Sequence, residues 1–244
     1  MLIHLVNPNT TASMTDKAAA VARAVAAPGT TIRADQPDDG PVSIEGPYDA
    51  AFAVPGMLGR IEAAIAAGAD AHVIACFDDT GLDAARALSP KPVIGIGEAA
   101  FHVASLLGER FSVVTTLSRS IPTIEANLVR YGLASRCARV RAAEVPVLAL
   151  EEEGSDACDR ISAEIARAIV EDRAEAIVLG CAGMTDLARR LERAHGVPVV
   201  DGVAAAVTLA EGLVRLGLST SKIGGWAQPV AKPYTGQFAA RSPK

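Results

Sequence analysis

Aromatic side chains are scarce in this chain of 244 residues: they make up 4% of it, with a single Trp. Alanine and branched aliphatic residues must therefore build the core, and small residues of this kind suit helices that pack closely on a sheet. Half of the residues are hydrophobic and 21% are charged, which excludes intrinsic disorder, because disorder needs low hydrophobicity and high charge. The length allows one large domain or two of roughly 100–120 residues.

Long apolar runs and an excess of positive charge are also lacking. No run approaches the ~20 apolar residues that a membrane span requires, and the formal net charge of −5 argues against nucleic acid or an anionic membrane as the main partner. The start, MLIHLVNPNT, has neither a basic region nor a cleavage site, so it is typical of a first strand rather than of a signal peptide. We expect a soluble, cytoplasmic protein that acts on a small molecule.

Cysteine and histidine are few, with four of each. The cysteines form no CxxC pair, which excludes a zinc or thioredoxin-like site, and they are too scattered for a disulfide scaffold. The histidines are isolated and lack the spacing of metal ligands. There is no GxGxxG or GxxxxGK[ST] fingerprint, and the glycines of GIGEAA do not form one. We therefore expect neither a bound metal nor a nucleotide cofactor.

Short apolar runs alternate with alanine-rich helical patterns along the chain. The runs are uninterrupted rather than alternating, which is typical of strands covered by helices on both faces. The predicted strands are Leu2–Val6, Thr31–Ala34, His72–Ala75, Val93–Ile96, Phe111–Thr115, Ala138–Ala142, Ala176–Leu179 and Val197–Val200. The predicted helices are Ser13–Ala27, Val54–Ala67, Gly81–Leu88, Ala99–Leu107, Ser120–Tyr131, Asp156–Glu171, Met184–His195 and Val203–Leu216. This alternation predicts an α/β fold with parallel sheets.

The chain also repeats itself. AHVIACFDDTGLDAARAL followed by PVIGIGEAA matches AIVLGCAGMTDLARRL followed by PVVDGVAAA, at a nearly constant offset. The repeat predicts two pseudo-symmetric lobes, each a mostly parallel sheet flanked by helices, with a site in the cleft between them. Residues 1–97 would form the first lobe, completed by residues 203–244, and residues 98–202 the second; residues 219–244 would form an irregular arm with a disordered end. The alternative is that any two βαβ units share such a pattern.

Two of the four cysteines, Cys76 and Cys181, occupy equivalent places in the repeat, directly after a strand and before a helix. Ligands of parallel sheets bind at the carboxyl ends of strands, and a helix N-terminus favours a thiolate, so we expect a lowered thiol pKa. Two thiols facing one carbon suit an exchange of stereochemistry, in which a thiolate removes a proton from one face and a thiol returns one to the other. The alternative is packing, because free cysteines are often buried. Cys137 and Cys158 have no such placement.

Neutral polar residues close the strands that lead to this predicted cleft. Amide and hydroxyl groups there can hold a carbonyl and stabilise an enolate-like oxyanion, or they can cap helices. They are Asn7, Asn9, Thr10 and Thr11 after the first strand and Thr115, Thr116 and Ser118 after its counterpart. The carboxylates of Asp78 and Asp79, next to Cys76, would disfavour a substrate with its own carboxylate, unless they point away or cap the helix.

Several strings resemble the aspartate/glutamate racemase superfamily and, within it, the hydantoin racemases. They span about residues 2 to 232 and are NPNTTASMT, PVSIEG, ACFDDTGLDAAR, FSVVTTLSRSIP, PVLALEEE, AIVLGCAGM and GVPVVDGVAAAV, of which SIEG and VLGCAGM are the most specific. The resemblance implies two α/β lobes, a cofactor-free two-cysteine mechanism and a homo-oligomer. By motif it implies an acid/base pair and substrate-holding positions: Cys76 and Cys181 for the pair, and Asn7, Phe77, Thr116 and Gly183 for the substrate. The family commonly has Pro where this chain has Thr80, which would change the stiffness of the loop beside Cys76.

The reaction that the resemblance implies is racemisation of a 5-monosubstituted hydantoin at C5. The C5 hydrogen lies beside a ring carbonyl, so its removal gives an enolate that hydrogen-bond donors stabilise. Allantoin, a hydantoin with a ureido group at C5, is the second candidate substrate, followed by aspartate or glutamate. Outside the racemases, a thiol-dependent hydrolase or an inert binding module remains open.

Overall fold

A computed structural model describes residues 1–152 and 154–243 of the chain. Its described strands form two four-stranded sheets in which every paired strand is parallel. The first sheet has the order β2-β1-β3-β4, formed by β1 (Leu2–Val6), β2 (Thr31–Asp35), β3 (Ala71–Ile74) and β4 (Val93–Gly95). The second has the order β6-β5-β7-β8, formed by β5 (Phe111–Thr115), β6 (Cys137–Ala142), β7 (Ala176–Gly180) and β8 (Val199–Val200). The predicted fold class is confirmed, and both sheets share one strand order, as the repeat predicts.

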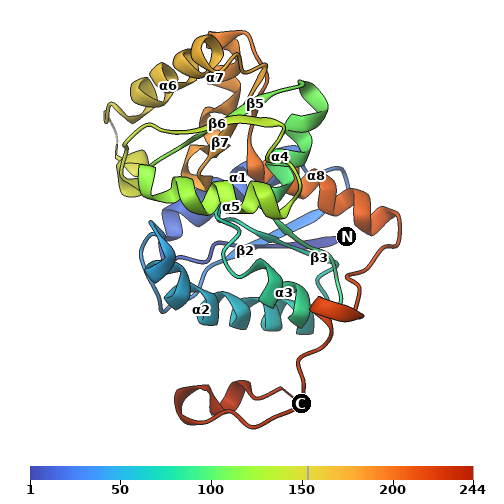
Figure 1. Cartoon of the computed structure of the whole chain (residues 1–244). Coiled ribbons are helices and arrows are strands. Elements are labelled where there is room, and N and C mark those ends of the chain that lie inside the picture. Colours follow the sequence, from blue (N-terminus) through green and yellow to red (C-terminus); the bar gives the residue numbers. More distant parts are fainter. Residues whose placement is uncertain (153, 244) are drawn as a thin grey trace.

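Helices cover both faces of each sheet (Figure 1). They are α1 (Ala12–Val25), α2 (Pro47–Ala66), α3 (Leu82–Leu88), α4 (Ile96–Leu107), α5 (Ile121–Arg130), α6 (Ala157–Glu171), α7 (Ala188–His195) and α8 (Gly202–Arg215). Short 3₁₀ turns are η1 (Ser118–Ser120), η2 (Val147–Glu151), η3 (Ala182–Leu187), η4 (Gly224–Trp226) and η5 (Gly236–Arg241). In the described part of the chain, no helix is long and apolar enough to cross a membrane.

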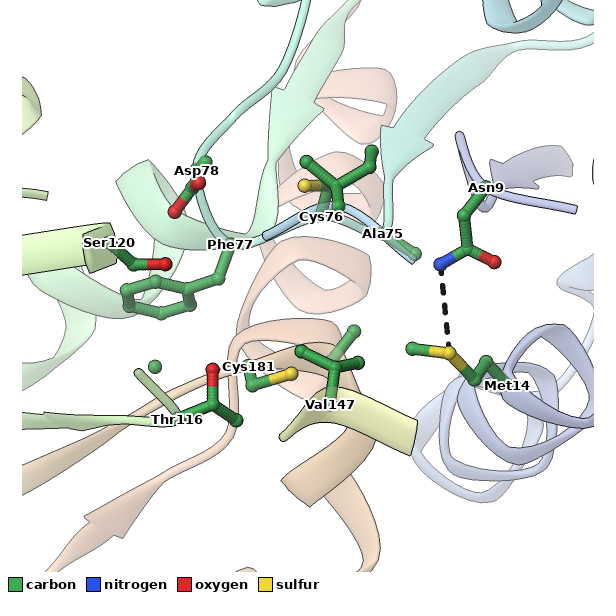
Figure 2. A pocket seen from close by; sticks show the side chains of 13 residues that line it. Asn9, Met14, Ala75, Cys76, Phe77, Asp78, Thr116, Ser120, Val147 and Cys181 are labelled. Carbon is green, nitrogen blue, oxygen red and sulfur yellow. Dashed lines mark hydrogen bonds between the residues drawn. The ribbon is translucent and has the colours of Figure 1, made fainter. Parts of the chain in front are cut away.

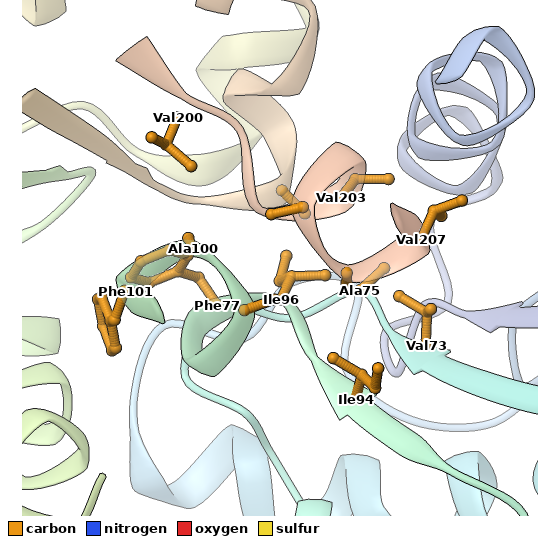
Figure 3. Close-up of a cluster of buried hydrophobic side chains, with 14 of the residues drawn as sticks. Val73, Ala75, Phe77, Ile94, Ile96, Ala100, Phe101, Val200, Val203 and Val207 are labelled. Carbon is orange, nitrogen blue, oxygen red and sulfur yellow. The ribbon is translucent and has the colours of Figure 1, made fainter. Parts of the chain in front are cut away.

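A continuous core lies between the two sheets. Helices α4 and α8 pack against each other there; α8 also contacts β3 and β4, while α4 contacts β7. The faces that meet are rich in alanine, and aromatic rings are few. Phe101 is fully buried and lies edge-on to Phe77 at 5.4 Å (Figure 3). It also stacks on Phe111 at 6.1 Å. The small side chains predicted from the composition thus occupy the layer that both sheets share.

Two smaller clusters cover the outer faces. Helices α2 and α3 pack on the first sheet, around Met57 and Ile61, and α6 and α7 on the second, around Ile161 and Ile165. The strands β3, β5 and β7 are buried along their whole length. Burial from both sides explains why these strands read as unbroken apolar runs rather than as alternating ones.

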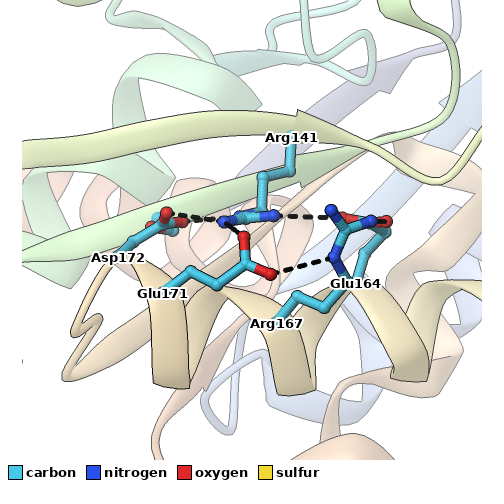
Figure 4. Close-up of polar contacts among 6 residues, drawn as sticks. Arg141, Glu164, Arg167, Glu171 and Asp172 are labelled. Atoms are coloured by element: carbon cyan, nitrogen blue, oxygen red, sulfur yellow. Dashed lines mark hydrogen bonds and ion pairs between the residues drawn. The ribbon is translucent and has the colours of Figure 1, made fainter.

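A buried guanidinium fastens the edge strand β6 to α6. The Arg141 side chain is 4% exposed, and its Nε and Nη2 atoms donate to the Asp172 carboxylate at 2.6 and 2.7 Å (Figure 4). Nη2 also donates to Glu171 at 2.6 Å. Removing one member of such a buried group leaves uncompensated charge, so the cluster fixes how the edge strand and helix meet.

Several predicted element boundaries differ from the structure. Helix α2 begins at Pro47, not at Val54, because Pro47 suits the first position of a helix while Pro55 is accommodated inside it. The predicted helix from Met184 divides into η3 and α7. The predicted arm is irregular over residues 219–243 apart from η4 and η5, and residue 244 lies outside the described residues. The division into lobes at residue 97 stays a prediction.

Candidate active site

A cavity of about 40 Å³ lies at the carboxyl ends of the strands, and segments that follow strands of both sheets line it. Cys76 comes from the segment after β3 and Cys181 from the residue directly after β7, so the two equivalent cysteines of the repeat line one cavity (Figure 2). The other lining residues are Asn9, Met14, Ile44, Ala75, Phe77, Asp78, Thr116, Ser120, Val147, Gly180 and Ala182. This is the place where parallel sheets bind ligands.

Each sulfur accepts from the backbone two residues further on, Cys76 from Asp78 and Cys181 from Gly183, and Cys76 has a hydroxyl neighbour as well. Cys76 Sγ lies 3.3 Å from the Thr80 hydroxyl oxygen. Cys181 Sγ accepts from the backbone N–H of Gly183 at 3.4 Å, which makes Cys181 the capping residue of η3. Gly183 therefore touches the thiol, although it does not line the cavity.

The thiol pKa values are not lowered as predicted. Burial raises the pKa of Cys76 to about 12, and nearby Asp78 raises it further. Burial likewise raises the pKa of Cys181 to about 12. Helix α3 begins only at Leu82, so its N-terminus does not offset the loss of water around Cys76. Both sulfurs are thiols at neutral pH, and generating a thiolate is part of the work that any chemistry here requires.

The two aspartates beside Cys76 point in different directions and have different contacts. Asp78 lines the cavity, and burial raises its pKa to about 6. Asp79 turns away: its carboxylate accepts from the backbone N–H of Gly97 at 3.0 Å and of Glu98 at 2.8 Å. It thus caps α4 from a distant loop, which explains why the helix begins at Ile96, three residues before the predicted start. Tyr131 also donates to Asp79, at 2.8 Å.

The glycines of GIGEAA make room for this cap. A Cβ atom on Gly95 would lie 2.0 Å from Asp79 Oδ1, and one on Gly97 would lie 2.3 Å from the carbonyl oxygen of Phe77. Backbone and carboxylate approach too closely for any larger residue. Gly95 and Gly97 therefore allow the loop that carries Cys76 to pack against the start of α4.

The predicted substrate-holding residues divide into two groups. Phe77 and Thr116 line the cavity. Asn7 does not; its amide donates to Asn9 Oδ1 at 2.8 Å and to Thr15 Oγ1 at 3.1 Å. Asn9 lines the cavity in its place, held by the Asn7 amide.

Residues that the pattern of strands and cysteines did not single out cover the cavity. Ile44 and Val147 line it from segments about a hundred residues apart in the chain, and Glu45 Oε1 accepts from the backbone N–H of Val147 at 3.1 Å. A second tie joins Lys17 of α1 to Glu151 of η2 at 2.8 Å. Glu45 belongs to the SIEG string and Val147 to PVLALEEE, so these two strings are the sequence signals for this cover.

The histidines stand apart from the cavity. All four lie in the described chain, and none lines it. His4 and His72 are fully buried in the first sheet with their Nδ1 atoms 3.3 Å apart, and His195 bonds Ser162 at 2.8 Å. Among the residues that the structure describes, no group of three or more His, Cys, Asp or Glu side chains is arranged to hold a metal ion.

Several known proteins that are similar to this chain over nearly its whole length are named racemases. The family described as "Asp/Glu/Hydantoin racemase" matches residues 3–210. A hydantoin racemase of Rhizobium meliloti is 52% identical over 97% of this chain and 98% of its own. The solved structure of an allantoin racemase from Klebsiella pneumoniae superposes with a TM-score of 0.97 at 48% identity and covers 100% of both chains. An allantoin racemase from Pseudomonas fluorescens gives a TM-score of 0.92 at 46% identity, over 97% of this chain and 100% of its own.

The match extends over most of the chain and includes both strand ends that line the cavity. The chain therefore belongs to the Asp/Glu/Hydantoin racemase family and is an isomerase of the racemase class.

Proposed function

We propose that this protein racemises 5-monosubstituted hydantoins at C5, without a cofactor, through Cys76 and Cys181. The observation that carries the proposal is their shared cavity: the two cysteines that the repeat makes equivalent line a single space from the ends of two different sheets. One face of a planar enolate would meet each sulfur. Relatives named hydantoin racemase at 40–52% identity support the substrate class.

The reaction needs one thiolate and one thiol, so one of the two thiols first releases its proton to solvent, after which the exchange at C5 balances with no other reagent. One sulfur, as thiolate, takes the C5 proton and becomes a thiol; the C5 electron pair delocalises into the adjacent carbonyl as an enolate. The other thiol then gives its proton to the opposite face and becomes the thiolate, and the roles are exchanged for the reverse direction. Thr116 and Asn9 line the cavity and supply a hydroxyl and an amide for the developing oxyanion.

The charge of the cavity favours an uncharged substrate. Asp78 has a pKa of about 6, so it is mostly ionised at pH 7 and repels a carboxylate beside Cys76. Hydantoins carry no carboxylate, whereas aspartate and glutamate do. This supports hydantoin-type substrates over amino acids.

Substrate entry requires the cavity to widen. A volume of about 40 Å³ holds only a few water molecules. The cover is fastened by the bond between Glu45 and Val147 and by the ion pair between Lys17 and Glu151. Lys17 also donates to the carbonyl of Leu150 at 3.2 Å, so all three contacts must break for the cover to move.

The test is loss of optical rotation of an L- or D-5-substituted hydantoin with purified protein and no added cofactor, together with exchange of the C5 hydrogen in D₂O. Cys76→Ser and Cys181→Ser should each stop racemisation, while single variants retain exchange on one face. Cys158→Ser is the matched control and should keep the wild-type rate. Full racemisation by either cavity variant would contradict the two-thiol mechanism.

Allantoin is the second candidate substrate, because the two solved structures that superpose with TM-scores of 0.97 and 0.92 are named allantoin racemases. Rates measured side by side with aliphatic hydantoins, aromatic hydantoins and allantoin decide between them. A thiol-dependent hydrolase would instead open the ring and release a new carboxylate. The absence of histidine from the lining of the cavity, with all four histidines described, disfavours that alternative.

We also propose that the chain forms a homo-oligomer in the cytoplasm. The arm after α8 carries apolar side chains outward: Ile223 is 90% exposed and Val230 76%. A cavity of about 700 Å³ separates the arm from α2 and α3. All four cysteines are free, as is typical of a reducing compartment. Light scattering of the full chain and of a variant that ends at residue 226 measures the number of subunits in each particle. The shorter chain should form a particle of fewer subunits.

A further inference from the structure

A buried threonine follows each cavity cysteine at the same distance in the chain. Thr80 comes four residues after Cys76, and Thr185 comes four residues after Cys181. Both residues are nearly inaccessible, at 6% and 4% exposure. Their hydroxyls nevertheless have different partners: Thr80 Oγ1 lies 3.3 Å from Cys76 Sγ, whereas Thr185 Oγ1 donates to a carboxylate oxygen of Asp201.

The difference arises from how the next helix is capped in each half. Asp201 is the N-cap residue of α8 and accepts from the backbone N–H groups of the first turn, so Thr185 finds a carboxylate nearby. The matching position in the first half is Gly95, which has no side chain to offer, and Asp79 caps α4 in its place. The Asp79 carboxylate accepts from Gly97 N–H, Glu98 N–H and the Tyr131 hydroxyl rather than from the Thr80 hydroxyl. Among the described residues, Cys76 is the partner of the Thr80 hydroxyl.

The loop holds the hydroxyl against the sulfur. The backbone N–H of Asp79 donates to the carbonyl of Cys76 at 3.0 Å, and that of Leu82 donates to the carbonyl of Asp79 at 3.1 Å. Asp79 has a left-handed φ of 51°, a conformation that its bonds to α4 keep in place. The hydrogen-bonded turn of the backbone therefore places Thr80 beside Cys76.

We propose that Thr80 is a positioning residue for Cys76 that supports both protonation states of its sulfur. The proposal rests on the two-thiol mechanism proposed above. A hydroxyl donates to the sulfur when Cys76 is a thiolate and accepts from the S–H when Cys76 is a thiol. The backbone N–H of Gly183, which contacts Cys181 at 3.4 Å, can only donate. The Cys76 sulfur also has a backbone donor, the N–H of Asp78, so the Thr80 hydroxyl is the group that distinguishes Cys76 from Cys181, and no proton passes to or from Thr80.

The test compares Thr80→Val with Thr80→Ser, and uses Thr185→Val as the matched control. Iodoacetamide alkylation of Cys76 and Cys181, followed by peptide mass spectrometry between pH 7 and 9, reports the reactivity of each thiol separately. Losing a donor to a thiolate should slow alkylation of Cys76 about tenfold at every pH. Thr80→Ser should stay within about twofold of wild type, and Cys181 should be unaffected in both.

The control separates the contact from general loosening. Thr185→Val removes an equally buried hydroxyl, so it should lower the urea midpoint while leaving alkylation of Cys76 unchanged. Racemisation gives a second measurement: in Thr80→Val, kcat should fall about tenfold, while KM changes little because Thr80 does not line the cavity.

The outcomes are separable from those of the proposed function. If Thr80→Val alkylates Cys76 at the wild-type rate, slows both thiols alike, or is matched by Thr80→Ser, the proposal is wrong. If alkylation slows as expected but no hydantoin or allantoin is racemised by the wild type, the contact is supported and the proposed function fails.

Discussion

The buried carboxyl group of Asp79 should make the stability of this protein fall between about pH 4 and 7. Burial raises its pKa to about 7, whereas an aspartate in an unfolded chain titrates near 3.9. Between these values the folded chain keeps a proton that the unfolded chain has released. This contribution to folding is complete below the unfolded pKa and is lost as the pH rises through the folded one. From pH 4.5 to 7.5 the loss is about 3 kcal/mol, because the free energy of unfolding falls by about 1.4 kcal/mol per unit of pH between the two pKa values.

Asp79→Asn removes this titration and keeps most of the geometry. The amide oxygen can still accept from Glu98 N–H and the Tyr131 hydroxyl, which share Oδ2 in the wild type. The amide nitrogen then faces Gly97 N–H, at a cost of about 1 kcal/mol. The variant should therefore be less stable than the wild type by about 1 kcal/mol at pH 4.5 and more stable by about 2 kcal/mol at pH 7.5.

Urea unfolding at fixed protein concentration, followed by circular dichroism across this pH range, measures the crossing. The free energy of unfolding of the wild type is subtracted from that of the variant at each pH. This cancels the contributions of groups that titrate in both chains, such as His72 and Asp78. The stability of Asp79→Ala should depend on pH in the same way as that of Asp79→Asn. Asp79→Ala should be less stable than Asp79→Asn at every pH, because it leaves three hydrogen-bond donors without their acceptor. A difference between Asp79→Asn and wild type that does not change with pH would refute the assignment of the titration to this carboxyl.

Three further outcomes follow from the same contacts. Gly97→Ala places a Cβ atom 2.3 Å from the carbonyl oxygen of Phe77, so it should lower the urea midpoint and abolish racemisation; a fully active, stable variant would contradict the close approach. Arg141→Ala strands the Asp172 carboxylate, and the free energy of unfolding should fall by about 3–5 kcal/mol, measured by urea titration, while turnover without denaturant stays near wild type. Because both cavity thiols have pKa values of about 12, the alkylation rate of each should rise towards tenfold per pH unit between pH 7 and 9; a plateau in this range would show that the thiols ionise more easily.

The sheets and the cysteine pair could be predicted because their signals are local. The unbroken apolar run before Cys76 and its counterpart before Cys181 record burial on both faces, and the repeat records their equivalence. The start of α4 could not be predicted, because its cap is Asp79, which is distant in the chain. The raised thiol pKa values were missed for a related reason: burial depends on both halves closing over the sulfurs.

The sequence predicts Asn7 as a substrate-holding residue, but Asn9 lines the cavity instead, which shows a second limit of prediction from sequence. Both amides follow the first strand, so residue type and spacing do not distinguish them. Only the direction of each side chain does: Asn7 points to Thr15 and holds Asn9, which reaches the cavity. The cover formed by Ile44 and Val147 is likewise a product of tertiary contact, since the two residues lie in separate halves of the chain.

The shared layer of α4 and α8 also sets the order in which the chain can become stable during synthesis. The inner face of β3 and β4 is covered by α8, which begins about a hundred residues after β4 ends. At about 5–20 residues per second, a ribosome needs roughly 5–20 s to make that stretch. An apolar face of the first sheet therefore stays exposed until α8 has been made. We expect chaperones to bind the nascent first half more than the finished enzyme.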